Sequence, residues 1–181
     1  MSLKSNQRGN FTVEFAILGV LFAALLVFSA DIVVKLALRG KLDRLSYSMV
    51  ELLKERTQLF EEDLDLSKDD ARLIDKIARG SLKRTYGPFD EKKYGILIEV
   101  QTFYAEGTEN FNKLQSFSFG GYQCSVKNDL TEFRDMSVVS SWGRQVPLYR
   151  VTLCYQGINW FGDLIDEDHK TVMSDAILIG R

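Results

Sequence analysis

Glu14 is the strongest candidate for a functional side chain, because it is an acid inside an apolar segment. The segment from Phe11 to Ala30 has twenty residues, and Glu14 is its only charged residue. As a helix this segment would be about 30 Å long, which matches the hydrocarbon core of a bilayer. An acid inside such a helix costs about 2.5–3.5 kcal/mol on insertion scales, and intramembrane acids usually have a function and a partner. The sequence therefore predicts a membrane-spanning helix in which Glu14 meets a cation.

Cys124 and Cys154 are the only cysteines of the chain and form a second candidate site. Both lie outside the apolar run, and an even pair in an exported domain indicates a disulfide. In the chain-entropy model, a loop of this size would add about 3–4 kcal/mol to the free energy of unfolding. Two buried free thiols are the alternative. Zinc binding is disfavoured because neither cysteine has a second cysteine or a histidine at ligand spacing.

The other candidates for catalysis or metal binding are weaker. His169, the only histidine, follows three acids and could bind a metal or act as a base, but a solvated side chain is the simpler interpretation. Residues 63–69 alternate acids as a calcium loop does, yet Lys68 and Ile74 replace the glycine and the final acid that such a loop requires. Several aromatic residues could line a carbohydrate site or belong to the core: Trp142, Tyr149, Tyr155, Trp160 and Phe161. No hydrolase, nucleotide-binding or metalloprotease motif occurs. We therefore expect no enzymatic activity, no cofactor and no metal site.

Length and composition allow one membrane anchor and one domain within 181 residues. The net charge is −2 and there is no basic block, which argues against nucleic-acid binding. A hydrophobic content of 45% with only two prolines argues against long disordered segments.

A long helix must position Glu14. Beyond the apolar run, apolar residues recur at helical spacing, with charged residues on the other face; the stripe comprises Leu38, Leu42, Leu45, Met49, Leu52 and Leu59. No proline interrupts the segment from Phe11 to Phe60. The sequence predicts one helix over residues 10–60, hydrophobic first and then amphipathic, whose second half packs under a globular domain.

Residues 61–181 predict an α+β domain. Ser67 and Asp70 resemble a capping box that opens a helix ending between Gly80 and Gly87. We expect Leu73, Ile74, Ile77 and Ala78 on the apolar face of this helix. Alternation with a period of two predicts strands over 94–104, with one buried face, and over 148–156. Two further strands are expected over 114–119 and 170–179. A short extended piece over 122–126 and a short helix over 128–136 are also expected. Because helices precede strands without a βαβ rhythm, the fold class is α+β with an antiparallel sheet.

The first thirty residues resemble the signal of type IV prepilins. In that family a short basic leader ends in glycine, the fifth mature residue is Glu, and an apolar helix follows. Here Lys4 and Arg8 would supply the basic leader, Gly9 would end it, and Asn10 would be the first mature residue. Phe15 after Glu14 completes the G-x-x-x-x-E-F pattern that is typical of the type IVb, Flp/Tad branch. Type IVa pilins usually begin with Phe, so Asn10 also favours type IVb and leaves N-methylation open.

The length of the chain beyond its helix makes it similar to the TadE/TadF minor pilins or pseudopilins, and TadF fits the length and leader better. This resemblance implies that a prepilin peptidase removes residues 1–9, and that Glu14 pairs with the amine of Asn10 in its own chain or in a neighbouring one. It implies a pilin-like subunit of a Flp pilus with a role in pilus assembly or initiation, adherence and biofilm formation. Its partners would be other pilins or pseudopilins of the pilus and the inner-membrane assembly platform. The protein would cross the bacterial inner membrane once, with residues 61–181 in the periplasm, and could enter an extracellular pilus.

Other interpretations stay open. The helix could tether a periplasmic binding module or enzyme, could be an uncleaved signal anchor with an accidental Glu14, or could belong to a type II secretion pseudopilin. Cleavage after Gly9 distinguishes a pilin from a tether. A count of positive charges opposes the expected orientation, because four cations follow the apolar run at Lys35, Arg39, Lys41 and Arg44. The prepilin resemblance and the cysteine pair favour a periplasmic domain, and we adopt that orientation.

Overall fold

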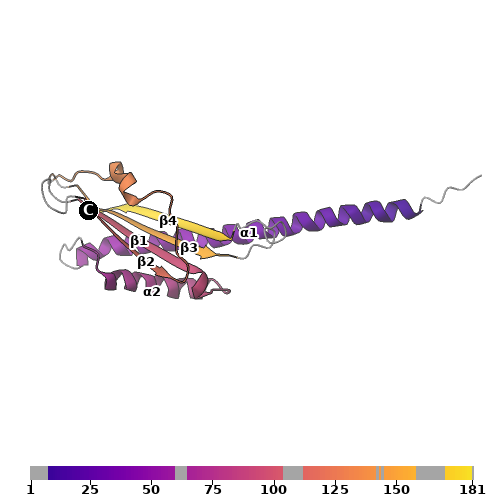
Figure 1. The fold of residues 1–181 in the computed structure, drawn as a ribbon, viewed down its shortest axis with the longest axis horizontal. Helices are drawn as coiled ribbons and strands as arrows, with labels where there is room; N and C mark the ends of the chain where they lie inside the picture. Colours follow the sequence, from indigo (N-terminus) through magenta and orange to yellow (C-terminus); the bar gives the residue numbers. More distant parts are fainter. Residues whose placement is uncertain are drawn as a thin grey trace, which may run out of the picture. The chain divides into compact units, whose positions relative to one another are not determined.

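The computed structural model describes residues 8–59, 65–103, 112–141, 143, 145–157 and 170–180 (Figure 1). The chain divides into two compact units. The first comprises Met1–Leu36 and Ile158–Lys170, and the second comprises Ala37–Gly157 and Thr171–Arg181. The second unit contains the sheet together with the latter part of the long helix.

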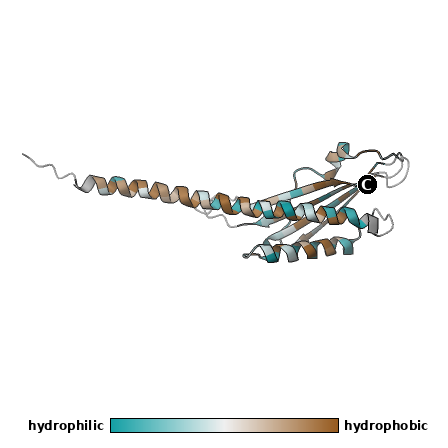
Figure 2. Ribbon diagram, turned by 180° about the vertical axis from the view of Figure 1, so that it is seen from behind, coloured by the Kyte–Doolittle hydropathy of each residue, from teal (hydrophilic) through white to brown (hydrophobic). Residues whose placement is uncertain are grey.

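The long helix α1 (Arg8–Leu59) has 52 residues and confirms the predicted helix. It forms because the segment contains no proline and many strong helix formers such as Leu and Ala. Within the first unit, the apolar side chains of α1 are exposed; Phe11 is 73% and Leu26 is 70% exposed. In Figure 2 the ribbon of this part of α1 is coloured mostly as hydrophobic, and the following part of the helix is a mixture of hydrophilic and hydrophobic residues.

The second unit is built on a four-stranded antiparallel sheet in the order β2-β1-β3-β4. The strands are β1 (Tyr94–Phe103), β2 (Asn112–Gly120), β3 (Leu148–Gln156) and β4 (Thr171–Ile179). One face of the sheet packs on α1 and on α2 (Lys68–Thr85), forming the main core. The expected α+β class with an antiparallel sheet is confirmed.

The main core corrects two predicted helix faces. On α1, Leu52 is 48% exposed, whereas Val50 and Leu53 are buried. Four residues of the predicted stripe are buried as expected, namely Leu38, Leu42, Leu45 and Met49, and the side chain of Leu59 lies outside the described part. On α2, Leu73 and Ile77 are exposed, whereas the buried apolar residues are Ala71, Ile74, Ala78 and Leu82. Apolar residues three and four apart occur on two faces of α2, and the face with two alanines allows closer packing than the face with Leu73.

The other face of the sheet is also partly covered, which corrects the prediction that β1 buries one face. Every residue of β1 is buried except Leu97, which is half-buried. This face is covered in part by the 3-10 helix η2 (Leu130–Met136), whose Leu130 packs with Phe103 and Leu148. A short helix was expected here over 128–136. The expected extended piece over 122–126 is not a strand.

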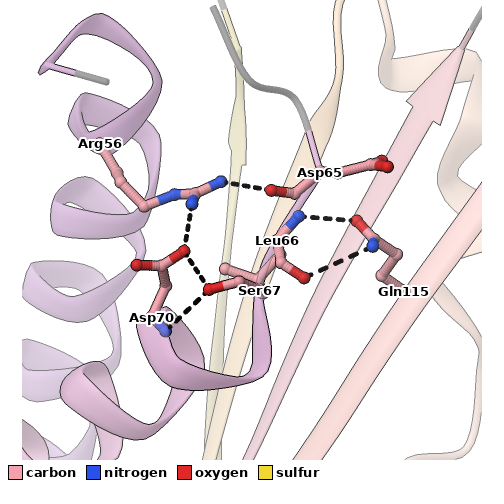
Figure 3. Close-up of polar contacts among 6 residues, drawn as sticks. All are labelled: Arg56, Asp65, Leu66, Ser67, Asp70 and Gln115. Carbon is pink, nitrogen blue, oxygen red and sulfur yellow. Dashed lines mark hydrogen bonds and ion pairs between the residues drawn. The ribbon is translucent and has the colours of Figure 1, made fainter. Parts of the chain in front are cut away.

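Polar contacts hold the start of α2 against α1 and β2 (Figure 3). Ser67 caps α2 by accepting a hydrogen bond from the Asp70 backbone N–H at 3.2 Å, as predicted. Arg56 pairs with the Asp70 carboxylate and donates to the Asp65 carbonyl at 2.9 Å. The Gln115 side chain accepts from the Leu66 N–H at 2.9 Å and donates to its carbonyl at 3.4 Å. The Gln115 amide therefore satisfies both backbone hydrogen-bonding groups of Leu66, just before α2, as the backbone of a neighbouring β-strand would.

Candidate assembly site

The residues of the prepilin-like motif lie at the start of α1. The backbones of Gly9 and Asn10 are in its first turns, and Glu14 follows Asn10 by four residues. Residues four apart lie on one face of a helix, so the Asn10 backbone and the Glu14 side chain are neighbours along the axis. Glu14 is exposed, and the rings of Phe11 and Phe15 stack at 6.4 Å between centroids on an adjacent part of the surface.

The apolar part of α1 can span a membrane by its length and composition. Its exposed apolar residues include Phe, Leu, Val and Ile on all sides of the helix, as the successive residues Val20, Leu21 and Phe22, each rotated by about 100° from the last, illustrate. Such a surface is rarely left open to water in soluble proteins. At the end of the apolar run, Lys35 Nζ forms an ion pair with Asp31 Oδ2 at 2.6 Å. An acid and a cation therefore neutralise each other within about one helical turn.

The predicted disulfide between Cys124 and Cys154 is present. Cys154 belongs to β3 and is fully buried, and Cys124 is almost as buried. Gly95 of β1 lies opposite Cys154, and its backbone is so close to the bridge that a Cβ atom would meet Cys154 Sγ at 2.9 Å and the Tyr122 carbonyl at 2.0 Å. The disulfide therefore fastens the segment after β2 to the centre of the sheet.

The sequence analysis did not identify a buried ion pair on the face of the sheet away from α1. Arg150 Nε donates to Glu99 Oε2 at 2.5 Å, and both side chains are 3% exposed. Arg150 Nη1 also donates to the Asn128 carbonyl at 2.8 Å. Burial raises the pKa of Glu99, while the positive charge of Arg150 acts in the opposite direction. The only signal in the sequence was a charged residue on each of two strands that are otherwise largely apolar.

The weaker candidate sites gain no support from the described residues. Tyr149 and Tyr155 are buried in the main core rather than lining a surface, so they are core residues and not part of a carbohydrate face. The described part of the chain holds no group of three or more acidic, histidine or cysteine side chains that could bind a metal ion. The remaining candidates lie outside the described residues: Trp142, Trp160, Phe161 and His169.

A helix with an apolar exposed first part, whose amphipathic second part packs on a four-stranded antiparallel sheet, defines a pilin-like protein. The candidate transmembrane helix and the disulfide are consistent with this class. The chain belongs to the TadF family, described as "Putative tight adherence pilin protein F", whose model matches residues 2–181. No curated protein and no solved structure matches the chain.

Proposed function

We propose that the protein is a minor pilin or pseudopilin of a tight-adherence (Flp, type IVb) pilus and acts in pilus assembly or initiation. The observation that carries this proposal is the start of α1, where Asn10 and Glu14 are one turn apart at the head of an exposed apolar helix. Membership of the TadF family across nearly the whole chain supports a pilus rather than a type II secretion pseudopilin. The role is structural, and adherence and biofilm formation are its expected consequences in the cell.

Cleavage between Gly9 and Asn10 by a prepilin peptidase would create a new cation, the amine of Asn10, one helical turn from Glu14. The new amine would lie at the N-terminus of α1, where the helix dipole disfavours a positive charge. A carboxylate one turn along the same face offsets that cost, and the amine in turn offsets the cost of Glu14 in lipid. The amine of a neighbouring subunit could serve equally well. Phe15 and Phe11 would then supply an aromatic surface for packing against other pilins.

The proposed setting is the bacterial inner membrane, crossed once by α1, with the second unit in the periplasm. The partners are the prepilin peptidase, other pilins or pseudopilins of the pilus, and the inner-membrane assembly platform. The disulfide supports this orientation, because such bonds persist in oxidising compartments.

Substitutions at two positions, Gly9 and Glu14, test processing and assembly separately. Gly9→Val should keep the leader, which mass measurement of the intact chain from a host with active peptidase would detect. Glu14→Ala and Glu14→Gln should insert and be cleaved normally, yet reduce pilus yield and surface adherence at equal protein level. Glu14→Asp, which keeps the charge, and Ser29→Ala, which changes a polar residue elsewhere in the same helix, are the matched controls and should retain more piliation.

The competing function is a tether for a binding module or enzyme. Normal piliation in the Glu14→Ala strain, or a native N-terminus at Met1, would overturn the pilin proposal and favour the tether. A tether requires neither the glycine nor the acid, since any apolar helix of this length would hold a domain at the membrane.

A further inference from the structure

Six exposed cations gather at the end of the second unit where α1 enters it. We call this group the basic rim; it comprises Arg39 and Lys41 of α1, Lys83 and Arg84 at the end of α2, and Lys92 and Lys93 of the 3-10 helix η1 (Glu91–Lys93). The α1 pair is more than 40 residues from the other four cations in the sequence. Their proximity is therefore a property of the folded unit.

Specific contacts hold these three elements together. Lys41 Nζ donates to the Thr85 carbonyl at 2.6 Å and lies 5.4 Å from the centre of the Tyr86 ring. The last turn of α2 is thus fixed beside the beginning of α1 in this unit. The following turn is held by Tyr155, whose hydroxyl donates to the Pro88 carbonyl at 3.0 Å and accepts from the Asp90 N–H at 2.7 Å. Lys92 and Lys93 come directly after this turn.

Few of the described acids lie beside the basic rim. In the described part of the chain, none of its six cations makes an ion pair. Asp90 and Glu91 are the only acids of the adjoining turn, and Asp90 Oδ1 already accepts a hydrogen bond from the Lys92 N–H. Asp43, an acid on the neighbouring turn of α1, accepts a hydrogen bond from Ser174.

The opposite end of the same unit differs. There, cations are matched by acids in the pairs Arg56–Asp70, Arg72–Asp69 and Lys113–Asp65. Lys68 and Lys76 of α2 are exposed single cations outside the basic rim. Among the described residues, positive charge without an ion-pair partner is therefore concentrated at one end of the unit.

We propose that the basic rim binds the phosphate groups of anionic phospholipids on the membrane that α1 enters. This inference rests on the proposed function only in taking α1 as the anchor. Arg39 and Lys41 continue the helix that contains the apolar run, and they follow Ala30 by about 14 and 17 Å along its axis. The headgroup layer accounts for about 6 Å of that distance. The long side chains of Arg39 and Lys41 can reach back toward the layer, and charges attract phosphates over a Debye length of about 8–10 Å. Basic residues near such a surface are attracted to anionic lipids.

The proposal also accounts for the cations that follow the apolar run. A positive-charge count would place them in the cytoplasm. In the folded protein, however, Lys35 pairs with Asp31, and Lys41 holds the end of α2. The basic rim therefore gives two of these four cations, Arg39 and Lys41, a role in the folded domain that is separate from orienting the anchor.

Lysine footprinting of the full chain in lipid nanodiscs tests the proposal. Discs of phosphatidylcholine would be compared with discs containing phosphatidylglycerol, using an acetylating reagent and mass spectrometry. Lys83, Lys92 and Lys93 should react about fivefold more slowly in the anionic discs at low salt, and the difference should shrink at high salt. Lys68 and Lys76 should react equally in both discs. Inorganic phosphate added to neutral discs should not reproduce the protection.

A charge variant supplies the matched comparison. Arg39→Gln with Arg84→Gln removes two members of the basic rim and keeps its lysines as reporters, so their protection should weaken. Arg72→Gln removes an exposed charge from the other end of α2 and should leave the protection unchanged. Equal reactivity of Lys83, Lys92 and Lys93 in both discs would overturn the proposal and favour an acidic protein surface as the partner. Because Glu14→Ala should keep the footprint, this test fails or succeeds independently of the pilin proposal.

Discussion

Breaking the Cys124–Cys154 disulfide should substantially destabilise the second unit. The bridge joins residues that are 30 positions apart, and the loop-closure relation gives about 3.7 kcal/mol for a loop of that size. Both sulfur atoms are buried, so reduction would leave two small apolar thiols in the core and add little further cost. For a unit of this size each kcal/mol shifts the melting temperature by about 3–4 °C, so reduction should lower it by roughly 10–15 °C.

Thermal unfolding of the full chain in detergent, followed by circular dichroism with and without reductant, measures this difference. The double variant Cys124→Ala with Cys154→Ala should melt near the reduced protein and show no response to reductant, which separates the bridge from side effects of the reagent. Equal melting temperatures for the oxidised and reduced protein would refute the loop-closure argument. Alkylation of both thiols in protein taken from cells, without prior reduction, would contradict both the bridge and the periplasmic orientation.

Three further predictions concern the second unit. Arg150→Met should cost about 3–5 kcal/mol in denaturant unfolding because it leaves the Glu99 carboxylate buried without its partner, and adding Glu99→Leu should recover much of the loss. Since burial raises the pKa of Glu99, the cost of Arg150→Met should be largest near neutral pH and should shrink as the pH falls through that raised pKa and the carboxylate is protonated. Gly95→Ala should prevent folding, as judged by circular dichroism, because its Cβ would overlap the Tyr122 carbonyl; Gly80→Ala, on an exposed part of α2 with open space, should instead raise stability by up to about 1 kcal/mol. Ser67→Ala should lower the free energy of unfolding by about 1 kcal/mol through loss of the α2 cap, and an unchanged melting temperature would contradict that role.

Local sequence patterns predicted most of the secondary structure. The absence of proline and the run of helix formers predicted α1 nearly to its last residue, and Ser67 located the start of α2. The four strands were predicted within a few residues of their observed bounds, two of them, β1 and β3, from alternation with a period of two. These features depend on neighbours within a few positions, which is why they can be predicted without a fold.

The candidate assembly site could also be described from the sequence. Gly9, Asn10, Glu14 and Phe15 lie on one helix, so their spacing alone places them along its axis. Their roles in processing and assembly stay predictions. The disulfide was predictable for a different reason, since only one pairing of two cysteines exists within the chain.

Tertiary packing decided the features that depend on distant residues. It placed Leu73 at the surface, and it buried both faces of β1 by laying η2 over the outer one. It also brought together Glu99 and Arg150, which are 51 residues apart, and collected the basic rim from three elements. Periodicity states which residues share a face, but which face is buried depends on the surface that packs against it. The sequence by itself therefore determined the anchor, its motif and the order of elements, whereas the charged interior and the charged end of the second unit arose only when the chain folded.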